Sequence, residues 1–241
     1  MKVSVIIPAA GASRRFGAKR KKIFEQIKGH PIFIRAIELF VNRNDVCQVQ
    51  LVVAEDDKEE MRTRYAANIG FMGVKLVVGG DTRTESVSNA LAKVSDEAEY
   101  ICVHDAARPC VSQLWIDGVF AAAEKFGSAI LAYPLHGTLK KVSPDNKIDK
   151  TLSRDGLWEA QTPQVFRRDI LERAYKNATG KADDDSALVE AIGETVVAVT
   201  CDPRNVKITR RSDLALASAV IDSLPKPKLT KSVGPFDEAQ W

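Results

Sequence analysis

Cysteine is scarce in this sequence and never occurs in close pairs. The four cysteines, Cys47, Cys102, Cys110 and Cys201, lie far apart, and no Cys-x-x-Cys spacing occurs. Zinc ribbons and dithiol redox motifs need such spacing, so neither is indicated. Three of the four lie in or beside apolar runs, which predicts reduced, partly buried side chains.

Long hydrophobic runs are also lacking. No apolar run approaches the roughly 20 residues that a membrane-spanning helix needs. The opening Met-Lys-Val-Ser-Val reads as the start of a strand rather than a secretory signal. Apolar residues make up 45% of the 241 residues and charged residues 28%, as in soluble globular proteins. We expect a cytoplasmic protein that makes no membrane contact.

The sequence has little net charge. A formal charge of +3 is too small for a general nucleic-acid binder, so we expect no nucleic-acid partner. The positive charge is instead concentrated early in the chain, where six cationic residues fall within nine positions: Arg14, Arg15, Lys19, Arg20, Lys21 and Lys22. This local excess indicates a small anionic ligand.

Short β-branched runs alternate with segments of helical period. The predicted strands are Val3–Ile7, Val49–Ala54, Lys75–Val78, Tyr100–Val103, Ala129–Tyr133 and Thr195–Thr200. The predicted helices are Pro31–Asn42, Asp57–Asn68, Thr82–Val94, Leu114–Phe126, Arg168–Asn177, Asp184–Ala191 and Ser212–Leu224. Most strands are apolar on both faces, as a covered parallel sheet requires. The pattern predicts a single α/β domain over residues 1–224, Rossmann-like and doubly wound, with a mostly parallel sheet and helices on both faces.

Two segments depart from this pattern. Residues 135–157 contain short alternating runs around Pro144-Asp145-Asn146, which predicts a protruding β-hairpin arm. An isolated hairpin is only marginally stable in water, so we expect the arm to pack on a second subunit. Residues 225–241 lack periodicity and are rich in proline and lysine, which predicts a flexible C-terminal tail.

Ligands of such sheets bind in the loops at the carboxyl ends of the strands. The first of these loops contains Pro8, Ala9, Ala10 and Gly11, whose small side chains let a ligand approach the backbone, and Arg15, which can bind phosphate. It matches neither Gly-x-Gly-x-x-Gly nor the P-loop, which makes a dehydrogenase improbable.

Three further loops carry candidate chemistry. Gly80, Asp81 and Ser86 can bind a base or ribose, or can simply form a tight turn with a helix cap. Asp105 follows an apolar strand and suits Mg²⁺, whereas His104 and Arg108 beside it read as a structural hydrogen-bonder and an ion-pair partner. Lys207, between two apolar residues, points either into the site or to solvent.

Taken together, these stretches resemble one family, the 2-C-methyl-D-erythritol 4-phosphate cytidylyltransferases. The matching stretches run from Val3 to about Leu224: Pro8-Ala9-Ala10-Gly11 with Arg14-Arg15, Gly79-Gly80-Asp81 with Arg83 and Ser86-Val87, Val103-His104-Asp105-Ala106-Ala107-Arg108-Pro109, Thr138 with Lys140, Arg154-Asp155-Gly156-Leu157-Trp158, Gln161-Thr162-Pro163-Gln164 and Val206-Lys207-Ile208-Thr209.

The resemblance implies a nucleotide-diphospho-sugar transferase type of fold and a direct reaction of CTP with a sugar-alcohol phosphate, assisted by Mg²⁺ or another divalent cation. It implies that Arg15, Lys22 and Lys207 are catalytic and that Asp105 binds the metal. The implied nucleotide-binding residues are Pro8, Ala9, Ala10, Gly11, Gly80, Asp81 and Ser86. The implied substrate-binding residues are Asp105, Arg108, Thr162 and, on an arm that completes the site of a homodimer partner, Thr138 and Arg154.

The sequence departs from the family pattern at a few positions. Lys21 stands where the family usually has proline, which leaves open whether Lys21 or Lys22 enters the site, and Gly137 and Ala182 replace residues on the acceptor side. The alternatives are therefore a ribitol-5-phosphate cytidylyltransferase and a non-catalytic nucleotide-binding module.

Overall fold

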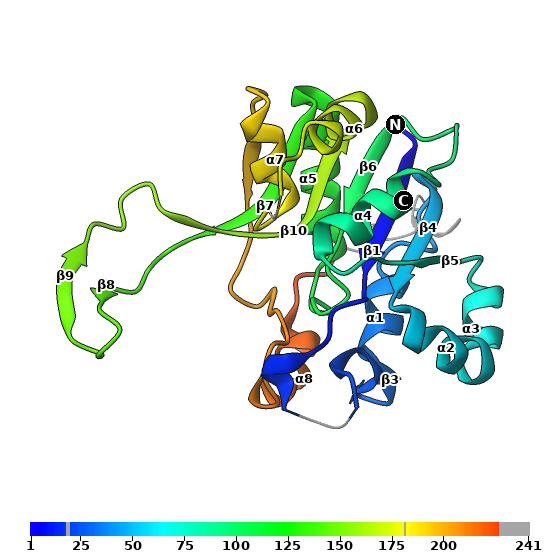
Figure 1. Cartoon of the computed structure of the whole chain (residues 1–241), viewed down its shortest axis with the longest axis horizontal. Coiled ribbons are helices and arrows are strands. Elements are labelled where there is room, and N and C mark those ends of the chain that lie inside the picture. Colours follow the sequence, from blue (N-terminus) through cyan, green and yellow to red (C-terminus); the bar gives the residue numbers. More distant parts are fainter. Residues whose placement is uncertain (18–19, 181, 227–241) are drawn as a thin grey trace, which may run out of the picture.

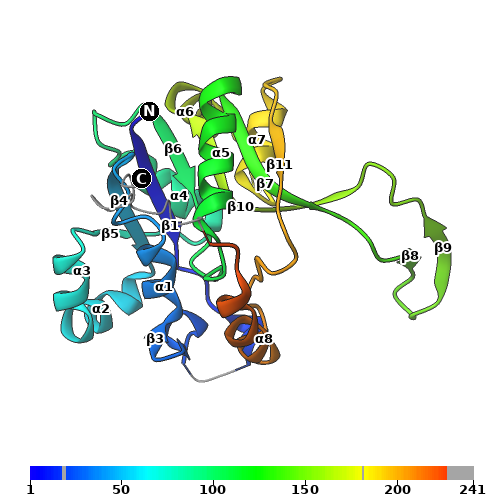
Figure 2. The ribbon, with the colours of Figure 1, turned by 180° about the vertical axis from the view of Figure 1, so that it is seen from behind.

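The computed structural model describes residues 1–17, 20–180 and 182–226. A seven-stranded sheet is covered by helices on both faces, and a two-stranded arm extends far from one side (Figure 1; Figure 2). The predicted tail falls outside the described residues from position 227 onward, as does Lys19.

The strands of the large sheet lie in the order β11-β7-β10-β6-β1-β4-β5. Their bounds are β1 Val3–Pro8, β4 Val46–Val53, β5 Lys75–Val78, β6 Tyr100–Val103, β7 Ser128–Pro134, β10 Trp158–Arg167 and β11 Val197–Thr200. Two short strands, β2 Gln26–Ile27 and β3 His30–Pro31, pair with each other, and the arm consists of β8 Leu139–Val142 and β9 Ile148–Leu152. All six predicted strands are present, with ends shifted by up to three residues.

The α-helices follow the predicted order. They are α1 Ile32–Glu38, α2 Lys58–Arg64, α3 Ala66–Phe71, α4 Arg83–Leu91, α5 Gln113–Phe126, α6 Arg168–Lys176, α7 Asp185–Ala191 and α8 Ser212–Val220. The single helix predicted over Asp57–Asn68 is wrong, because Tyr65 has φ −123° and separates α2 from α3. The Tyr65 ring stacks on Phe24 at 5.9 Å and meets Phe33 edge-on at 5.0 Å, contacts that no local pattern encodes.

The glycine that follows Asn68 does not end the helix. Gly70 lies inside α3, and the positive φ of 63° occurs three residues later at Gly73. The capping box predicted at Thr82 is confirmed: the Thr82 side chain accepts from the Glu85 N–H while the Glu85 carboxylate accepts from the Thr82 N–H. The loop after β5 therefore leads directly into the N-terminus of α4.

Both faces of the sheet are covered because its strands are apolar on both sides. On one face Val5, Leu51 and Leu131 pack with residues of α1 and α5. On the other face Ile6 and Ile101 pack with residues of α4, α6 and α7. This is the doubly wound arrangement that the strand composition predicts.

β10 is the strand that the periodicity misses. It runs antiparallel to both β6 and β7 and fills the gap between them, whereas the other pairs in the large sheet are parallel. Its sequence carries Gln161, Pro163 and Gln164 in its middle, and the pairing with β7 shifts register between Ala160 and Gln164. Proline and polar residues argue against a central strand, so only the pairing of distant segments reveals it.

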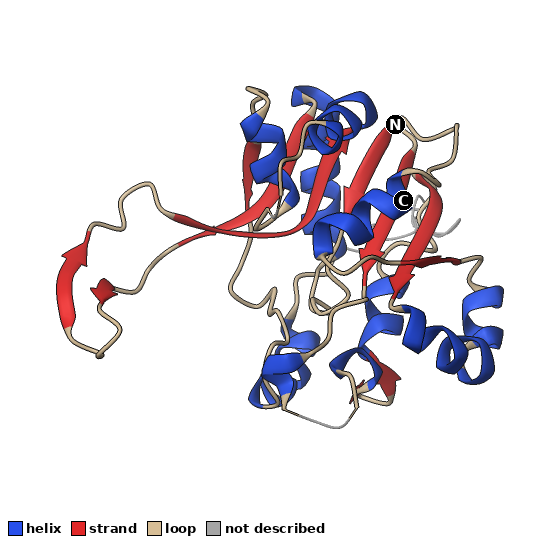
Figure 3. Cartoon of the chain, in the orientation of Figure 1, coloured by secondary structure: helices blue, strands red, loops and turns tan. Residues whose placement is uncertain are grey.

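The arm predicted over 135–157 leaves the sheet between β7 and β10 and stands apart from the helices (Figure 3). β8 pairs antiparallel with β9, and Asn146 in the connecting turn has φ 64°. In the described part of the chain, no helix combines the length and the apolar character needed to cross a bilayer.

Candidate functional site

The loops at the carboxyl ends of β1, β5 and β6 surround a pocket of about 530 Å³. All the predicted nucleotide-binding and cationic residues line it, together with Asp105: Pro8, Ala9, Ala10, Gly11, Arg15, Lys22, Gly80, Asp81, Ser86, Asp105 and Lys207. They come from four distant parts of the chain. The doubly wound fold brings them together because parallel strands end at one edge of the sheet.

The first loop is held at both of its ends. The Ala9 N–H donates to the Val52 carbonyl at 2.7 Å, and the Phe16 side chain is buried in a small apolar cluster with Ile32. The left-handed backbone falls at Ser13 and Gly17 rather than at Gly11, where the composition places it. A Cβ on Gly11 would meet nothing within 4 Å, so this part of the loop is open toward the pocket.

Lys22 is the lysine of the basic cluster that reaches the centre of the site. Its Nζ donates to the Ile208 carbonyl at 2.8 Å, in the segment that carries Lys207. Burial lowers the pKa of Lys22, and the nearby ammonium of Lys207 lowers it further. Two like charges that line one pocket favour an anion there.

The two preceding cations have partners away from the pocket centre. Lys21 forms an ion pair with the buried Asp57 at 2.7 Å, and Arg20 bonds Glu60 at 2.8 Å while lying over the Phe24 ring. The backbone of Lys21 has φ −64°, the value to which proline is fixed, so lysine here keeps the backbone geometry that proline would impose. Lys21 and Lys22 both line the pocket, but Lys22 contacts the segment of Lys207, whereas Arg20 and Lys21 are paired with acidic side chains.

The second loop has no room for side chains. A Cβ on Gly79 would lie 2.9 Å from the Ala10 Cβ, and one on Gly80 would lie 2.5 Å from the Glu85 Cβ. The Ser86 hydroxyl accepts from the Gly80 N–H and donates to the Thr82 carbonyl. Close approach of the first loop therefore requires glycine at position 79, and packing of the second loop on the start of α4 requires glycine at position 80.

Asp105 lies between two cations at the end of β6. Its Oδ2 is 2.5 Å from the Lys207 Nζ, and its Oδ1 is 3.3 Å from the Arg83 Nε. Burial alone raises the pKa of this carboxyl, but the charges of Arg83 and Lys207 outweigh burial and hold the pKa well below its ordinary value. Asp105 is thus an ionised, buried carboxylate that faces the pocket.

A chain of buried hydrogen bonds fixes the loop around Asp105. The Asp105 N–H donates to the Thr162 hydroxyl oxygen at 3.1 Å, and that hydroxyl lies 3.2 Å from the His104 Nδ1. The His104 Nε2 bonds the Arg108 carbonyl at 2.9 Å, and burial lowers the pKa of His104 to about 4. His104 is therefore a neutral structural residue, as the sequence predicts.

Thr162 and Arg108 line a second, smaller pocket of about 200 Å³ next to the first. Arg83, Asp105 and Lys207 line both pockets. The site is therefore a continuous region with a larger compartment on the glycine-loop side and a smaller one against β10.

Sequence reasoning assigned no role to several residues of this region. Arg83 links Asp105 to the buried Asp185, and Asn205 donates from its Nδ2 to the Gln161 side chain and the Thr162 carbonyl. Arg83 follows Gly80 by three residues and Asn205 precedes Lys207 by two. Their short distance in the sequence from predicted site residues is the feature by which both could have been predicted. Asp184 caps α7 through the Ala187 N–H, which confirms that the acidic segment 183–185 serves as a helix N-terminus.

The structure does not bring Thr138 and Arg154 to either pocket. Both are exposed on the arm, where Arg154 donates to the His136 carbonyl. The arm also exposes apolar side chains, with Ile148 64% and Val142 48% accessible.

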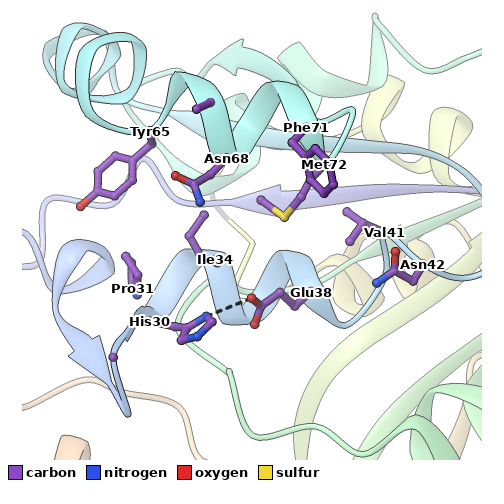
Figure 4. Close-up of a pocket in the computed structure, with 12 residues that line it drawn as sticks. His30, Pro31, Ile34, Glu38, Val41, Asn42, Tyr65, Asn68, Phe71 and Met72 are labelled. Atoms are coloured by element: carbon purple, nitrogen blue, oxygen red, sulfur yellow. Dashed lines mark hydrogen bonds and ion pairs between the residues drawn. The ribbon is translucent and has the colours of Figure 1, made fainter.

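A larger cavity than the charged pocket lies elsewhere in the described residues. It measures about 790 Å³ and opens between α1 and α3, where Ile34, Tyr65 and Met72 line it and His30 bonds Glu38 (Figure 4). Its lining residues include neither lysine nor arginine, so it is no phosphate site. Size is therefore a poor guide to the chemistry here, and the charged pocket at the strand ends is the candidate active site.

Comparison with known proteins shows the family of the chain. The family model described as 2-C-methyl-D-erythritol 4-phosphate cytidylyltransferase matches residues 3–223. Proteins of that name from Rhodopirellula baltica and Carboxydothermus hydrogenoformans are each 40% identical to the chain; the first alignment covers 91% of this chain and 95% of the relative, the second 90% and 94%. The crystal structure of the protein of that name from Thermus thermophilus superimposes with a TM-score of 0.78 at 30% identity, covering 92% of this chain and all of that one. The chain therefore belongs to the 2-C-methyl-D-erythritol 4-phosphate cytidylyltransferase family.

Proposed function

We propose that this chain transfers the cytidylyl group of CTP to 2-C-methyl-D-erythritol 4-phosphate, forming 4-diphosphocytidyl-2-C-methyl-D-erythritol and pyrophosphate. The observation that carries the proposal is the meeting of Arg15, Lys22 and Lys207 in one pocket beside two loops of small residues. Family membership names the acceptor, and the pocket supplies the charge that a triphosphate needs.

The larger compartment holds the nucleotide. The backbone of Pro8–Gly11 and the glycine loop at Gly80 lie close together, and Asp81 and Ser86 offer polar groups to a base or ribose. Arg15, Lys22 and Lys207 line the same pocket and receive the triphosphate.

The reaction is a direct displacement at phosphorus. A phosphate oxygen of the acceptor forms the new bond to the α-phosphorus of CTP, and the bond from that phosphorus to the bridging oxygen of pyrophosphate breaks. The acceptor phosphate is already ionised, so no general base is needed. Arg15, Lys22 and Lys207 stabilise the negative charge that develops on the α-phosphate and the leaving group.

Asp105 fits a magnesium ligand. Mg²⁺ often binds proteins through one or two carboxylates and takes its other ligands from substrate phosphates and water. The described residues contain no group of three or more His, Cys, Asp or Glu side chains suited to a metal, which agrees with a site of one or two carboxylates that the substrate completes. Bound there, the ion would neutralise phosphate charge.

The smaller compartment receives the acceptor. Thr162 lines it with a buried hydroxyl, and Arg108 adds a cation whose Nε has no hydrogen-bond partner among the described residues. The remaining contacts come from Thr138 and Arg154 on the arm of a second subunit. The exposed apolar side chains of the arm, Ile148 and Val142 among them, support a homodimer because an isolated hairpin gains little stability in water.

Pyrophosphate release tests the proposal. The chain is incubated with CTP and Mg²⁺, and 2-C-methyl-D-erythritol 4-phosphate or ribitol 5-phosphate is added separately. We expect turnover with the first acceptor and little with the second. A preference for ribitol 5-phosphate would overturn the choice of acceptor, and CTP binding without turnover of either would overturn the assignment as an enzyme.

A further inference from the structure

Asp105 is held by two cations that differ in how firmly each is fixed. Arg83 approaches Oδ1 from the first turn of α4, and Lys207 approaches Oδ2 from the segment before α8. Both cations also border the two compartments of the site. The cation that is less firmly fixed determines which carboxylate oxygen of Asp105 can exchange its ion-pair partner.

Arg83 is anchored from behind. Its Nη2 donates to the Asp185 Oδ2 at 2.6 Å, and Asp185 is fully buried at the N-terminus of α7. The other oxygen of Asp185 accepts from the Tyr175 hydroxyl at 2.5 Å, and the Asp185 N–H donates to the Gln164 side chain. The planar guanidinium of Arg83 therefore binds the carboxylates of Asp105 and Asp185 at once. It thereby connects α4 with α7 and with the end of β6.

Lys207 has no comparable anchor. Its side chain is 41% exposed, and Asp105 is its ion-pair partner among the described residues. The Lys22 ammonium lies close enough that the two charges disfavour each other. An incoming triphosphate competes with Asp105 for Lys207, and a single point charge on a flexible stem can turn toward it.

We propose that Arg83 is a positioning residue that clamps Oδ1 of Asp105 to the buried Asp185, so that Oδ2 alone exchanges Lys207 for Mg²⁺ when CTP binds. The inference rests on the proposed function. It assigns the two cations separate tasks: Arg83 keeps the carboxylate in place, while Lys207 moves to the triphosphate.

This arrangement couples the metal to the nucleotide. Lys207 and Mg²⁺ compete for the same oxygen, so a triphosphate that draws Lys207 away strengthens metal binding, and by reciprocity the metal strengthens CTP binding. Without Arg83, the Asp105 carboxylate can turn toward Lys207 with both oxygens, and the coupling weakens. Lysine at position 83 keeps the charge but cannot bridge two carboxylates with a planar fork.

Binding measurements without acceptor test the clamp, because no turnover occurs. Calorimetry gives two affinities, that for CTP in EDTA and that of the CTP complex for Mg²⁺. Both are measured for the intact chain, Arg83→Gln, Arg83→Lys and Asp185→Asn. Asp105→Asn is the reference that lacks the carboxylate. We expect Arg83→Gln to weaken Mg²⁺ binding roughly 10- to 100-fold, as loss of a residue that orients a ligand does. CTP binding in EDTA should weaken far less than Mg²⁺ binding, because without metal Arg83→Gln acts on CTP only through the Asp105–Lys207 ion pair. The Mg²⁺ affinity of Arg83→Lys should lie between those of the intact chain and Arg83→Gln.

Arg43→Gln is the matched control, because Arg43 is likewise held by two carboxylates, Asp45 at 2.6 Å and Asp117 at 2.8 Å, and lines neither compartment. It should leave both affinities unchanged. Asp185→Asn should show the same loss of Mg²⁺ affinity as Arg83→Gln even though Asp185 lines neither compartment. If one of these two variants does not fold, the other still tests the proposal.

The outcomes separate the two proposals. If Asp105→Asn weakens Mg²⁺ binding and a folded Arg83→Gln does not, the clamp is wrong and the proposed function stands. If Arg83→Gln weakens CTP binding in EDTA to the same extent as metal binding, Arg83 is a phosphate ligand and the clamp is again wrong. If the intact chain does not bind CTP, the proposed function itself fails.

Discussion

Acidification should unfold this protein partly through His104. The ring is fully buried, with its Nε2 on the Arg108 carbonyl and its Nδ1 on the Thr162 hydroxyl. A carbonyl only accepts, so Nε2 carries the proton and Nδ1 accepts from Thr162 in the neutral ring. A second proton would place a charge in the interior beside Phe40, whose ring lies 5.3 Å away.

The size of the effect follows from the shift. The pKa of His104 falls from 6.5 in the unfolded chain to about 4 in the folded one. The unfolded state therefore binds the proton first, so this contribution is fully present above pH 6.5 and is lost as the pH falls through 4. At 1.36 kcal/mol per pKa unit the full loss is about 3 kcal/mol, of which about 2 kcal/mol is already lost at pH 5.

Urea unfolding at pH 7.5 and pH 5, followed by tryptophan fluorescence, measures this loss. His104→Gln keeps a side chain that can donate and accept but cannot titrate. We expect its stability to change about 2 kcal/mol less between the two pH values than that of the intact chain. His136→Gln, at an exposed histidine of the arm, is the control and should keep the full pH dependence. An unchanged pH dependence in His104→Gln would refute the neutral, buried imidazole.

Three further predictions concern the reaction. Replacing Arg15 or Lys207 with alanine should lower turnover by about 10²- to 10³-fold, with an unchanged circular dichroism spectrum, and near-normal turnover would contradict the assigned roles. Arg154→Ala should raise the KM for the acceptor more than that for CTP. Mixed dimers of Arg154→Ala and Lys207→Ala subunits should regain one intact site, and no recovery would speak against completion of the site by the arm. Lys21→Pro should leave turnover close to that of the intact chain because the backbone already has φ −64°. Lys22→Ala should nearly abolish turnover in the same steady-state assay. Equal losses of turnover in the two variants would refute the distinction between the two lysines.

The sequence by itself determined the βα order, the apolar strands and the loops that carry the chemistry. These features are local: β-branched runs, a capping box at Thr82 and glycines before a helix are readable without knowing any distant contact. Since parallel strands end at one edge of the sheet, the order of elements was also enough to predict that Gly11, Gly80 and Asp105 meet. For Lys207 it left open whether the side chain points into the site or to solvent.

The tertiary structure was needed for features that depend on contacts between residues far apart in the sequence. β10 could not be read from a stretch with Gln161, Pro163 and Gln164, because those polar groups are satisfied by α7 and Asn205. The basic cluster has no local signal that separates Lys22 from its neighbours. The separation comes from Asp57 and Glu60, which hold Lys21 and Arg20, and from Ile208, whose carbonyl accepts from Lys22. The sequence gives the number of cationic side chains in this cluster. The orientation of each side chain depends on the acidic and carbonyl groups that the fold places near it.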